Sequence, residues 1–359
     1  MLNVKKILVI SNMYPSPREP ALGIFVERVS AQMIDRGHDV TLAVRCASRW
    51  KILSYLRFFI HAFGKVLFSR ADLVYVHFVT HSYIPVMFAF LLRSMPLAVH
   101  VHGADIISDK KQSRLSARCF SIVRRAALGR AALIVAPSNY FRDLVSDRFP
   151  SVKDKIVVSP SGGVDLAAFR DASSSARVRG ELMFFGRLML GKGVMLVIPA
   201  VEAVRARRSD LEVSVVFAGD GPALAALSEQ AKASAVSVRF LGAVDPHRVP
   251  QTLSTATALV FPSFRQGESL GLVALEGMAC GRPVIAARSG AMEEIVQDGV
   301  NGALFEINDI HGLSLAIESM LTLDDLAWKR VSDAALRRVE AFDAQRVSLE
   351  LSEALCRVF

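Results

Sequence analysis

The sequence has few cysteines and only a modest share of charged residues. It contains four cysteines in 359 residues, far apart and without a CxxC pair, so neither a disulfide framework nor a cysteine metal site is expected. This cysteine usage predicts a reducing compartment. Charged residues make up 21% of the chain and hydrophobic residues 52%, a composition too apolar for an intrinsically disordered protein.

Long hydrophobic runs are also scarce. The first apolar run, ILVI at 7–10, is too short for the hydrophobic core of a signal peptide and is typical of a first β-strand. The stretch 73–92 has no charged residue and could span a bilayer by its length, but its His, Thr, Ser and Pro residues divide it into a strand and a helix. We therefore expect a cytoplasmic protein.

Short apolar runs alternate with helical patterns along nearly the whole chain, which predicts an α/β fold with parallel sheets. The polar segment DASSSAR at 171–177 separates two series of strands, so we expect two doubly wound Rossmann-like domains. They would occupy residues 1–170 and 171–340, with a helix at 341–359 packing back on the first domain. The candidate strands lie at 6–11, 39–44, 72–78, 97–103, 132–138, 155–160, 181–186, 212–219, 237–242, 258–263, 283–287 and 302–306.

Positive charge is concentrated in the first predicted domain. The formal net charge is +9, but residues 1–170 hold 24 Lys and Arg against 11 Asp and Glu, whereas the remainder holds 19 against 23. Nucleic acid, a phosphorylated ligand and an anionic bilayer are all compatible partners for a basic surface. Such a partner is expected to meet the first domain.

The segment GRLMLGKG at 186–193 follows a predicted strand and precedes a helical pattern. Its spacing nearly matches the P-loop, but Gly193 occupies the position of the hydroxyl that would bind Mg²⁺, which argues against an NTPase. Arg187 and Lys192 bracket a turn at a helix start, an arrangement suited to holding a diphosphate without a metal ion. A charged turn at a solvated helix end is the alternative interpretation.

A second glycine-rich segment carries two glutamates eight positions apart, Glu268 and Glu276. If Ser269 begins a helix, Glu276 lies about two turns into it and Glu268 lies at its amino-terminal edge. The N–H groups of Ser269, Leu270 and Gly271 would then face an anion. A glutamate within this apolar helix needs a polar partner such as ribose hydroxyls. An ordinary capped helix remains the alternative.

Together these two segments closely resemble the second domain of the retaining GT-B glycosyltransferases of family 4, including their E-x7-E signature. The resemblance covers most of residues 3–310 and implies a GT-B fold, with two Rossmann-like domains facing across a cleft. Gly162 and Ala291 depart from residues common in the family. Supporting motifs follow in the family's order at 11–44, 100–105, 135–145, 159–169 and 217–222.

The resemblance also implies roles for individual positions. Arg187 and Lys192 would hold the donor diphosphate and Glu276 the ribose, while Glu268 and His102 would lie near the donor sugar as catalytic residues. No general base is assigned, because such enzymes are thought to transfer the sugar with help from the leaving diphosphate. The implied donor-binding set is Gly23, Arg187, Lys192, Ser269, Leu270, Gly271 and Glu276.

The sequence offers little evidence for a metal ion. No D-x-D motif occurs, so we expect transfer without a metal and with no cofactor other than the nucleotide sugar substrate. His77 and His81 have an i, i+4 spacing but lack the glutamate of a zinc motif, which favours a packing role. His100 and His102 lie two apart on a predicted strand and therefore share a face.

The segment 50–68 is predicted to form a basic amphipathic helix. Its polar residues would lie within one arc and leave a broad apolar face, suited either to a bilayer surface or to packing on the first sheet. We expect residues 50–70 and the basic stretch 110–130 to contact an anionic membrane. The predicted polar arc consists of Lys51, Ser54, Arg57, His61 and Lys65.

The resemblance implies a retaining hexosyltransferase, which we expect to be metal-independent and to lie at the inner face of the cell membrane. It would move a sugar from a nucleotide diphosphate sugar to a lipid-linked saccharide in surface polysaccharide or glycolipid synthesis. A nucleotide-sugar 2-epimerase of the same fold is an alternative. A basic nucleic-acid-binding protein is a second, but helix-turn-helix and aromatic-platform motifs are missing, so no nucleic acid partner is expected.

Overall fold

The computed structural model describes residues 4–19, 22–103, 105–107, 113–173 and 177–358. The chain divides into two compact units: unit 1 comprises Met1–Gly163 with Ala344–Phe359, and unit 2 comprises Val164–Asp343. The change from one unit to the other lies at Gly163, near the boundary predicted at residue 170. The helix α6 runs from Leu166 to Ser173, so the polar segment 171–177 begins inside a helix, and its residues 174–176 lie outside the described part.

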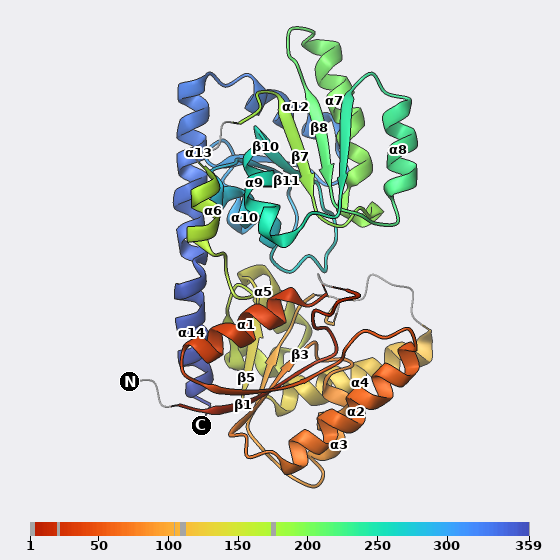
Figure 1. The fold of residues 1–359 in the computed structure, drawn as a ribbon, viewed down its shortest axis with the longest axis vertical. Coiled ribbons are helices and arrows are strands. Elements are labelled where there is room, and N and C mark those ends of the chain that lie inside the picture. Colours follow the sequence, from red (N-terminus) through yellow and green to blue (C-terminus); the bar gives the residue numbers. More distant parts are fainter. Residues whose placement is uncertain (1–3, 20–21, 104, 108–112, 174–176, 359) are drawn as a thin grey trace. The chain divides into compact units, whose positions relative to one another are not determined.

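Unit 1 contains a six-stranded parallel sheet in the order β2-β1-β3-β4-β5-β6 (Figure 1). Each strand lies within one of the predicted runs, and β1, β3, β4 and β5 are almost entirely buried, as expected for a parallel sheet covered on both faces. The strands are β1 Lys6–Ser11, β2 Asp39–Val44, β3 Leu73–His77, β4 Leu97–His100, β5 Leu133–Ala136 and β6 Ile156–Val158.

Helices cover both faces of this sheet. The helix α2 shows why: Phe58, Ala62 and Val66 recur every fourth residue and are buried, so one stripe packs on the strands. The predicted helix at 50–68 is therefore confirmed. One face carries α1 (Ile24–Asp35) and α14 (Ala344–Cys356); the other carries α2 (Lys51–Phe68), α3 (Tyr83–Ala89), α4 (Arg114–Arg130) and α5 (Asn139–Arg148).

Unit 2 repeats this plan with a second six-stranded parallel sheet, in the order β12-β11-β10-β7-β8-β9. The strands are β7 Glu181–Phe185, β8 Ser214–Ala218, β9 Ser237–Gly242, β10 Ala258–Phe261, β11 Val284–Ala287 and β12 Gly302–Phe305. The helices α7 (Val194–Arg207), α8 (Leu224–Lys232) and α12 (Ile310–Leu321) pack on one face. The helices α6, α9 (Val249–Ser254), α10 (Leu272–Ala279) and α13 (Asp325–Val339) pack on the other.

The strand order changes direction once in each sheet. In unit 1, the chain crosses from β1 to β2 in one direction along the sheet and from β3 to β4 in the opposite direction. In unit 2, the crossovers from β7 to β8 and from β10 to β11 likewise run in opposite directions. At such a point the loops that follow the two strands separate and leave a crevice at their carboxyl ends, where ligands of α/β proteins bind. The loops after β1, β3, β7 and β10 are therefore the places to look for a site.

The structure also bears on membrane-spanning segments. The uncharged stretch 73–92 forms β3 and α3, as predicted. Among the described residues, no helix is both long enough and apolar enough to cross a membrane.

Candidate functional site

The loop after β7 brings Lys192 to the carboxyl edge of the unit 2 sheet. A 3-10 turn at Leu190–Lys192 ends at Gly193, which has φ of 68° and begins α7. A Cβ at Gly193 would lie 2.1 Å from the carbonyl oxygen of Pro262, so only glycine allows this loop to pack against the loop after β10. The close approach of the two backbones sets the position of the lysine.

Lys192 forms an ion pair with Glu268 across the two loops. Its Nζ lies 3.5 Å from Glu268 Oε2, and the two side chains are 17% and 18% exposed. The same carboxylate oxygen accepts a hydrogen bond from Ser263 Oγ at 3.1 Å. The two residues named by the resemblance as diphosphate and sugar contacts are therefore adjacent, and a bound phosphate would compete with Glu268 for the ammonium group.

The helix after β10 begins later than predicted. It runs from Leu272 to Ala279, with Gly271 at its N-cap in the left-handed conformation, φ 80°. The expectation that Ser269 begins the helix is wrong: Ser269 and Leu270 lie in the preceding loop, and Glu268 lies four positions before the first helical residue. Leu270 in this loop is buried, with only 3% of the residue exposed.

This later start changes the position of Glu276. Glu276 is the fifth residue of α10, just over one turn into the helix instead of two, and it is partly buried. Gly277 beside it has no room for a side chain, because a Cβ would lie 1.9 Å from Leu259 Cδ1. The free N–H groups at the start of this helix therefore belong to its first turn, from Leu272 onward, and not to Ser269 and Leu270 as predicted.

The other predicted cation, Arg187, is exposed at the start of the same loop. The next residue, Leu188, contacts the loop after β8. A Cβ at Gly221 would lie 2.2 Å from the carbonyl oxygen of Leu188, and Leu188 N–H donates to the carbonyl of Asp220. The supporting motif at 217–222 thus includes a packing element that supports the β7 loop. Sequence reasoning missed Arg265, whose side chain packs on Gly191: a Cβ at that glycine would lie 3.0 Å from the Cγ of the arginine.

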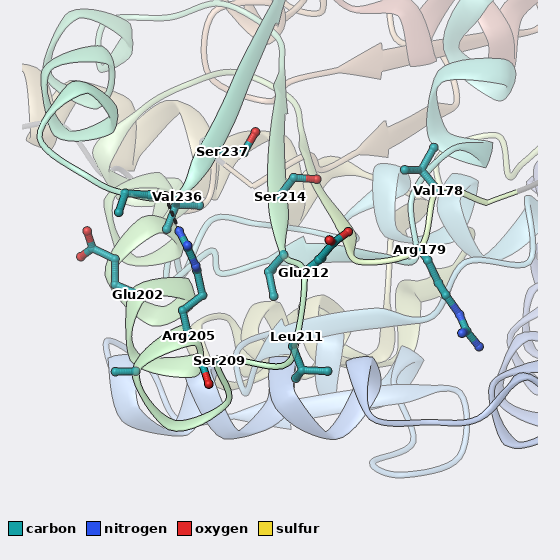
Figure 2. A pocket seen from close by; sticks show the side chains of 13 residues that line it. Val178, Arg179, Glu202, Arg205, Ser209, Leu211, Glu212, Ser214, Val236 and Ser237 are labelled. Atoms are coloured by element: carbon teal, nitrogen blue, oxygen red, sulfur yellow. Dashed lines mark hydrogen bonds between the residues drawn. The ribbon is translucent and has the colours of Figure 1, made fainter.

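A depression of about 830 Å³ lies elsewhere on unit 2 (Figure 2). Its lining includes Ser214 and Ser237, the first residues of β8 and β9, together with Glu202 and Arg205 of α7. These are the amino ends of the strands, the edge opposite the carboxyl ends where ligands of α/β sheets bind. We therefore place the candidate site at the β7 and β10 loops and not in this depression.

In unit 1, Gly23 begins α1 just after the loop that follows β1. It has φ of 72°, and a Cβ there would lie 2.5 Å from the carbonyl oxygen of Met13. Substitution would therefore push the helix away from the loop. Two residues later, the ring of Phe25 lies 4.5 Å from the ring of His102, centre to centre, so the predicted Gly23 and His102 belong to neighbouring parts of one edge.

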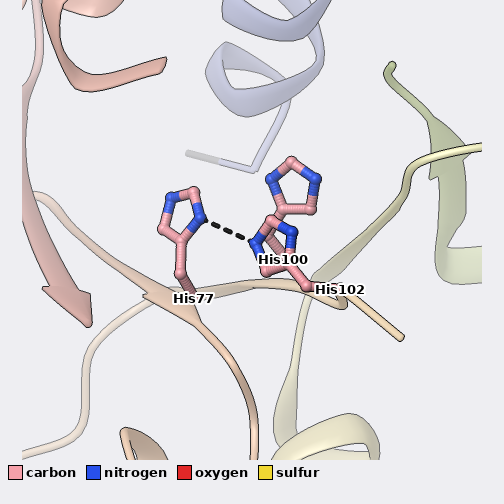
Figure 3. Close-up of side chains that lie close together, drawn as sticks. All are labelled: His77, His100 and His102. Atoms are coloured by element: carbon pink, nitrogen blue, oxygen red, sulfur yellow. Dashed lines mark hydrogen bonds between the residues drawn. The ribbon is translucent and has the colours of Figure 1, made fainter. Parts of the chain in front are cut away.

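Three histidines meet at this carboxyl edge (Figure 3). His77 ends β3, His100 ends β4, and His102 follows two residues later on the same face. One ring nitrogen from each histidine lies within 4.8 Å of those from the other two. His77 Nδ1 forms a hydrogen bond with His102 Nε2 at 3.0 Å, and Tyr75 Oη forms one with His100 Nδ1 at 2.8 Å.

Burial keeps these imidazoles neutral. It lowers the pKa of His100 to about 3, and it lowers the pKa of His77 and His102 well below the usual value, with their histidine neighbours adding to the effect. Burial also raises the pKa of Asp105 to about 6, although its carboxylate accepts backbone N–H groups. Those donors are His102 at 2.9 Å and Val79 at 3.2 Å.

Sequence reasoning missed His77 and Asp105. The i, i+4 spacing relates His77 to His81, but His81 contacts Tyr55 and Phe120 and is not part of the cluster. The shared face of His100 and His102 is confirmed. One feature of the sequence could have indicated that His77 belongs to the cluster: β3 and β4 are neighbouring strands and both end in histidine. The backbone at Phe78, between His77 and Val79, has φ of 63°, an unfavourable conformation that accumulates at functional sites.

Comparisons with known proteins agree with this architecture. The family described as "Glycosyl transferases group 1" matches residues 179–323, and the "Glycosyl transferase 4-like domain" matches residues 48–162. The two matches together span more than half of the chain. They also cover the loops after β7 and β10 and the strands that carry the three histidines.

Individual relatives give the same result. A glycogen synthase of Mycobacterium tuberculosis is 27% identical over 96% of this chain and 92% of its own length. A phosphatidyl-myo-inositol mannosyltransferase of Mycolicibacterium smegmatis is 33% identical over 53% of this chain, which spans about half (49%) of that relative. The crystal structure of Anabaena HepE with UDP and glucose shares the fold, with a TM-score of 0.74, 19% identity and coverage of 98% and 99%. The chain therefore belongs to the group 1 glycosyltransferases of GT-B fold.

Proposed function

We propose that this chain transfers a sugar, with retention of configuration and without a metal ion, from a nucleoside diphosphate sugar to a lipid-linked saccharide. The observation that carries the proposal is the Lys192–Glu268 pair at the point where the unit 2 strand order reverses. A lysine there can hold a diphosphate, and the ion pair with a glutamate at 3.5 Å orients its ammonium group.

The residues of this site would have to stabilise the negative charge that develops on the leaving diphosphate. As the bond between sugar and diphosphate breaks, negative charge grows on the phosphate oxygens, and preorganised cations and helix amino termini stabilise it. Lys192, the exposed Arg187 and the first turns of α7 and α10 supply such groups. Glu276 lies in α10 where it can accept hydrogen bonds from ribose hydroxyls, and Glu268 can turn toward the sugar once phosphate occupies Lys192.

The acceptor part of the proposal is supported by the surface of unit 1. The helices α2, α3 and α4 cover one face of the sheet (Figure 1), and large apolar side chains on α2, on α4 and just after α3 are exposed to solvent. Cations lie among them on α2 and α4. The exposed apolar residues include Ile52 (88%), Ile60 (66%), Leu91 (79%), Leu92 (74%), Leu115 (74%) and Ile122 (66%).

Apolar side chains that alternate with cations suit the boundary between lipid head groups and acyl chains. The packing of α2 on the sheet leaves this surface available, because the buried stripe runs through Ser54, Phe58 and Val66. Ser54 thus departs from the predicted polar arc: it is buried and accepts a hydrogen bond from Arg45 Nη1 at 3.2 Å. The predicted contact region 110–130 is described from residue 113 onward; residues 110–112 lie outside the described part.

Donor use is tested by incubating the protein with UDP-, GDP- and ADP-sugars and measuring nucleoside diphosphate release. A lipid-phosphate-linked saccharide is then added, and NMR of the product gives its anomeric configuration. Release that depends on the acceptor, and a product with the donor's configuration, support the proposal. A new nucleotide sugar formed without acceptor would instead show an epimerase, and an inverted product would contradict the retaining mechanism.

Membrane binding is tested by flotation with vesicles that contain phosphatidylglycerol. The variant Lys51→Glu, Arg57→Glu and Lys65→Glu should lose most vesicle binding, because it reverses the charges that border the exposed apolar residues of α2. The matched control reverses three exposed cations of unit 2: Lys232, Arg248 and Arg330. Equal flotation of the two variants would contradict the membrane part of the proposal.

A further inference from the structure

The rings of His77 and His102 meet edge to edge. Their centres are 5.2 Å apart and their planes differ by only 12°, while Nδ1 of His77 lies 3.0 Å from Nε2 of His102. Because the ring centres are much farther apart than the two nitrogens, the rings are nearly coplanar and do not lie face to face (Figure 3). The lone pair of one nitrogen therefore points at the N–H of the other, which is the geometry of a directed hydrogen bond.

One neutral imidazole must donate and the other must accept. If His102 donated from Nε2, the proton of His77 would be on its own Nε2, which is buried and has no partner among the described residues. Buried N–H groups without a partner are rarer than buried acceptors without one. The favoured arrangement therefore places the proton of His77 on Nδ1, where it donates to His102.

The consequence for His102 is a defined tautomer. Its Nε2 is the acceptor of this bond, so its own proton is on Nδ1. His102 is partly exposed, whereas His77 and His100 are completely buried. Nδ1–H of His102 is then the ring group left to donate a hydrogen bond to a ligand.

We propose that His77 is a positioning residue that holds His102 in the Nδ1–H tautomer and in one ring plane, so that His102 donates a hydrogen bond to a hydroxyl of the transferred sugar. The hydrogen bond from His102 to the sugar rests on the proposed function, whereas the tautomer of His102 does not. Asp105 fixes the backbone of the same residue, because it accepts the N–H of His102. His102 is thus held from both its ring and its main chain.

The same three histidines could be considered a metal site, since one ring nitrogen from each lies within 4.8 Å of the others. The ring geometry favours the hydrogen bond. An ion bound by His77 Nδ1 and His102 Nε2 would have to break the bond between those atoms, and Nδ1 of His100 is already paired with Tyr75. Metal binding is therefore an outcome that would overturn the proposal.

The tautomer is tested directly by NMR of the full-length protein labelled with [¹⁵N]histidine, without donor. The two-bond couplings and nitrogen shifts of His102, assigned with a His102→Gln variant, should show a protonated Nδ1 and an unprotonated Nε2. A protonated Nε2 on His102 would overturn the proposal. So would a shift of the His102 nitrogens on addition of one equivalent of Zn²⁺.

Two variants of His77 separate positioning from packing. His77→Asn can keep an amide donor near the position of Nδ1, whereas His77→Leu cannot donate. His77→Leu should lower kcat about tenfold with little change in the KM for the donor, and His77→Asn should recover most of the loss. The control is Tyr75→Phe, which removes a buried hydrogen bond of the same cluster but leaves the His77–His102 bond intact.

The kinetic result contradicts the proposal if Tyr75→Phe loses as much kcat as His77→Leu, or if His77→Asn is no better than His77→Leu. Failure of the proposed function looks different. In that case the wild-type protein transfers no sugar, while the NMR spectrum still shows the Nδ1–H tautomer of His102.

Discussion

Replacement of His100 by leucine should make the stability of unit 1 less sensitive to pH. His100 is completely buried at the end of β4, and burial lowers its pKa to about 3 from the ordinary value of 6.5. In the unfolded chain this side chain takes up a proton as the pH falls below 6.5, whereas in the folded protein it stays neutral until about pH 3. The unfolded state therefore binds more protons in this window, and the wild type loses stability as the pH falls.

The size of the effect follows from the separation of the two pKa values. Each pH unit inside the window lowers the free energy of unfolding by about 1.4 kcal/mol for one such histidine. Between pH 7 and pH 5 the wild type should thus lose about 2 kcal/mol relative to His100→Leu. Asp105 acts in the opposite direction, because its pKa is raised to about 6, but it is present in both proteins and cancels in the difference.

The measurement is urea unfolding at pH 7, 6 and 5, followed by far-UV circular dichroism. The two units can unfold in separate transitions, and the transition that moves in His100→Leu belongs to unit 1. The control is Val99→Ala, a buried change in the same strand that introduces no titratable group; its difference from the wild type should be constant with pH. A constant difference for His100→Leu as well would refute the reasoning, because it would mean that His100 titrates alike in the folded and unfolded states.

Three other predictions follow from the site. Lys192→Met should lower turnover about 10²-fold or more, because it removes a cation placed to stabilise the leaving diphosphate; a transfer assay near the wild-type rate would contradict the assignment. Gly277→Val should destabilise unit 2 by at least about 1–3 kcal/mol, since even a Cβ there would lie 1.9 Å from Leu259 Cδ1, and a melting temperature equal to that of the wild type would be inconsistent with this packing. Sugar transfer should survive excess EDTA; complete loss that Mn²⁺ restores would show that a metal ion is required.

Most of the strands could be predicted because they are short, buried apolar runs. Runs such as ILVI in β1 are covered on both faces of a parallel sheet, and turn residues bound them, so their positions are visible without knowledge of the fold. The start of α10 could not be predicted in the same way. Serine is the favoured N-cap residue, but here Gly271 in the left-handed conformation occupies that position and the side chain of Leu270 is buried ahead of it.

The histidine cluster shows a second limit of sequence reasoning. His77 and His102 are 25 positions apart, and no local periodicity relates them. They meet because β3 and β4 are parallel neighbours in a register that places His77 opposite His100. The resemblance gave Lys192 and Glu268 separate roles at the donor, but their ion pair could not be predicted. Their two loops follow strands that are adjacent in the sheet but far apart in the sequence.

The distribution of charge bears on the two contacts that we propose, one with the donor and one with a membrane surface. Divided at the boundaries of the two units, unit 1 holds 25 Lys and Arg against 12 Asp and Glu, and unit 2 holds 18 against 22. Lys192 thus lies in a net acidic unit, where its charge is balanced locally by Glu268, so the contact that we propose between Lys192 and a diphosphate does not depend on a basic surface. The positive excess of unit 1 includes exposed cations on α2 and α4 among large apolar side chains. Charge in that setting favours an extended anionic surface, because many weak, screened contacts add there, whereas a compact diphosphate needs only a few directed ones.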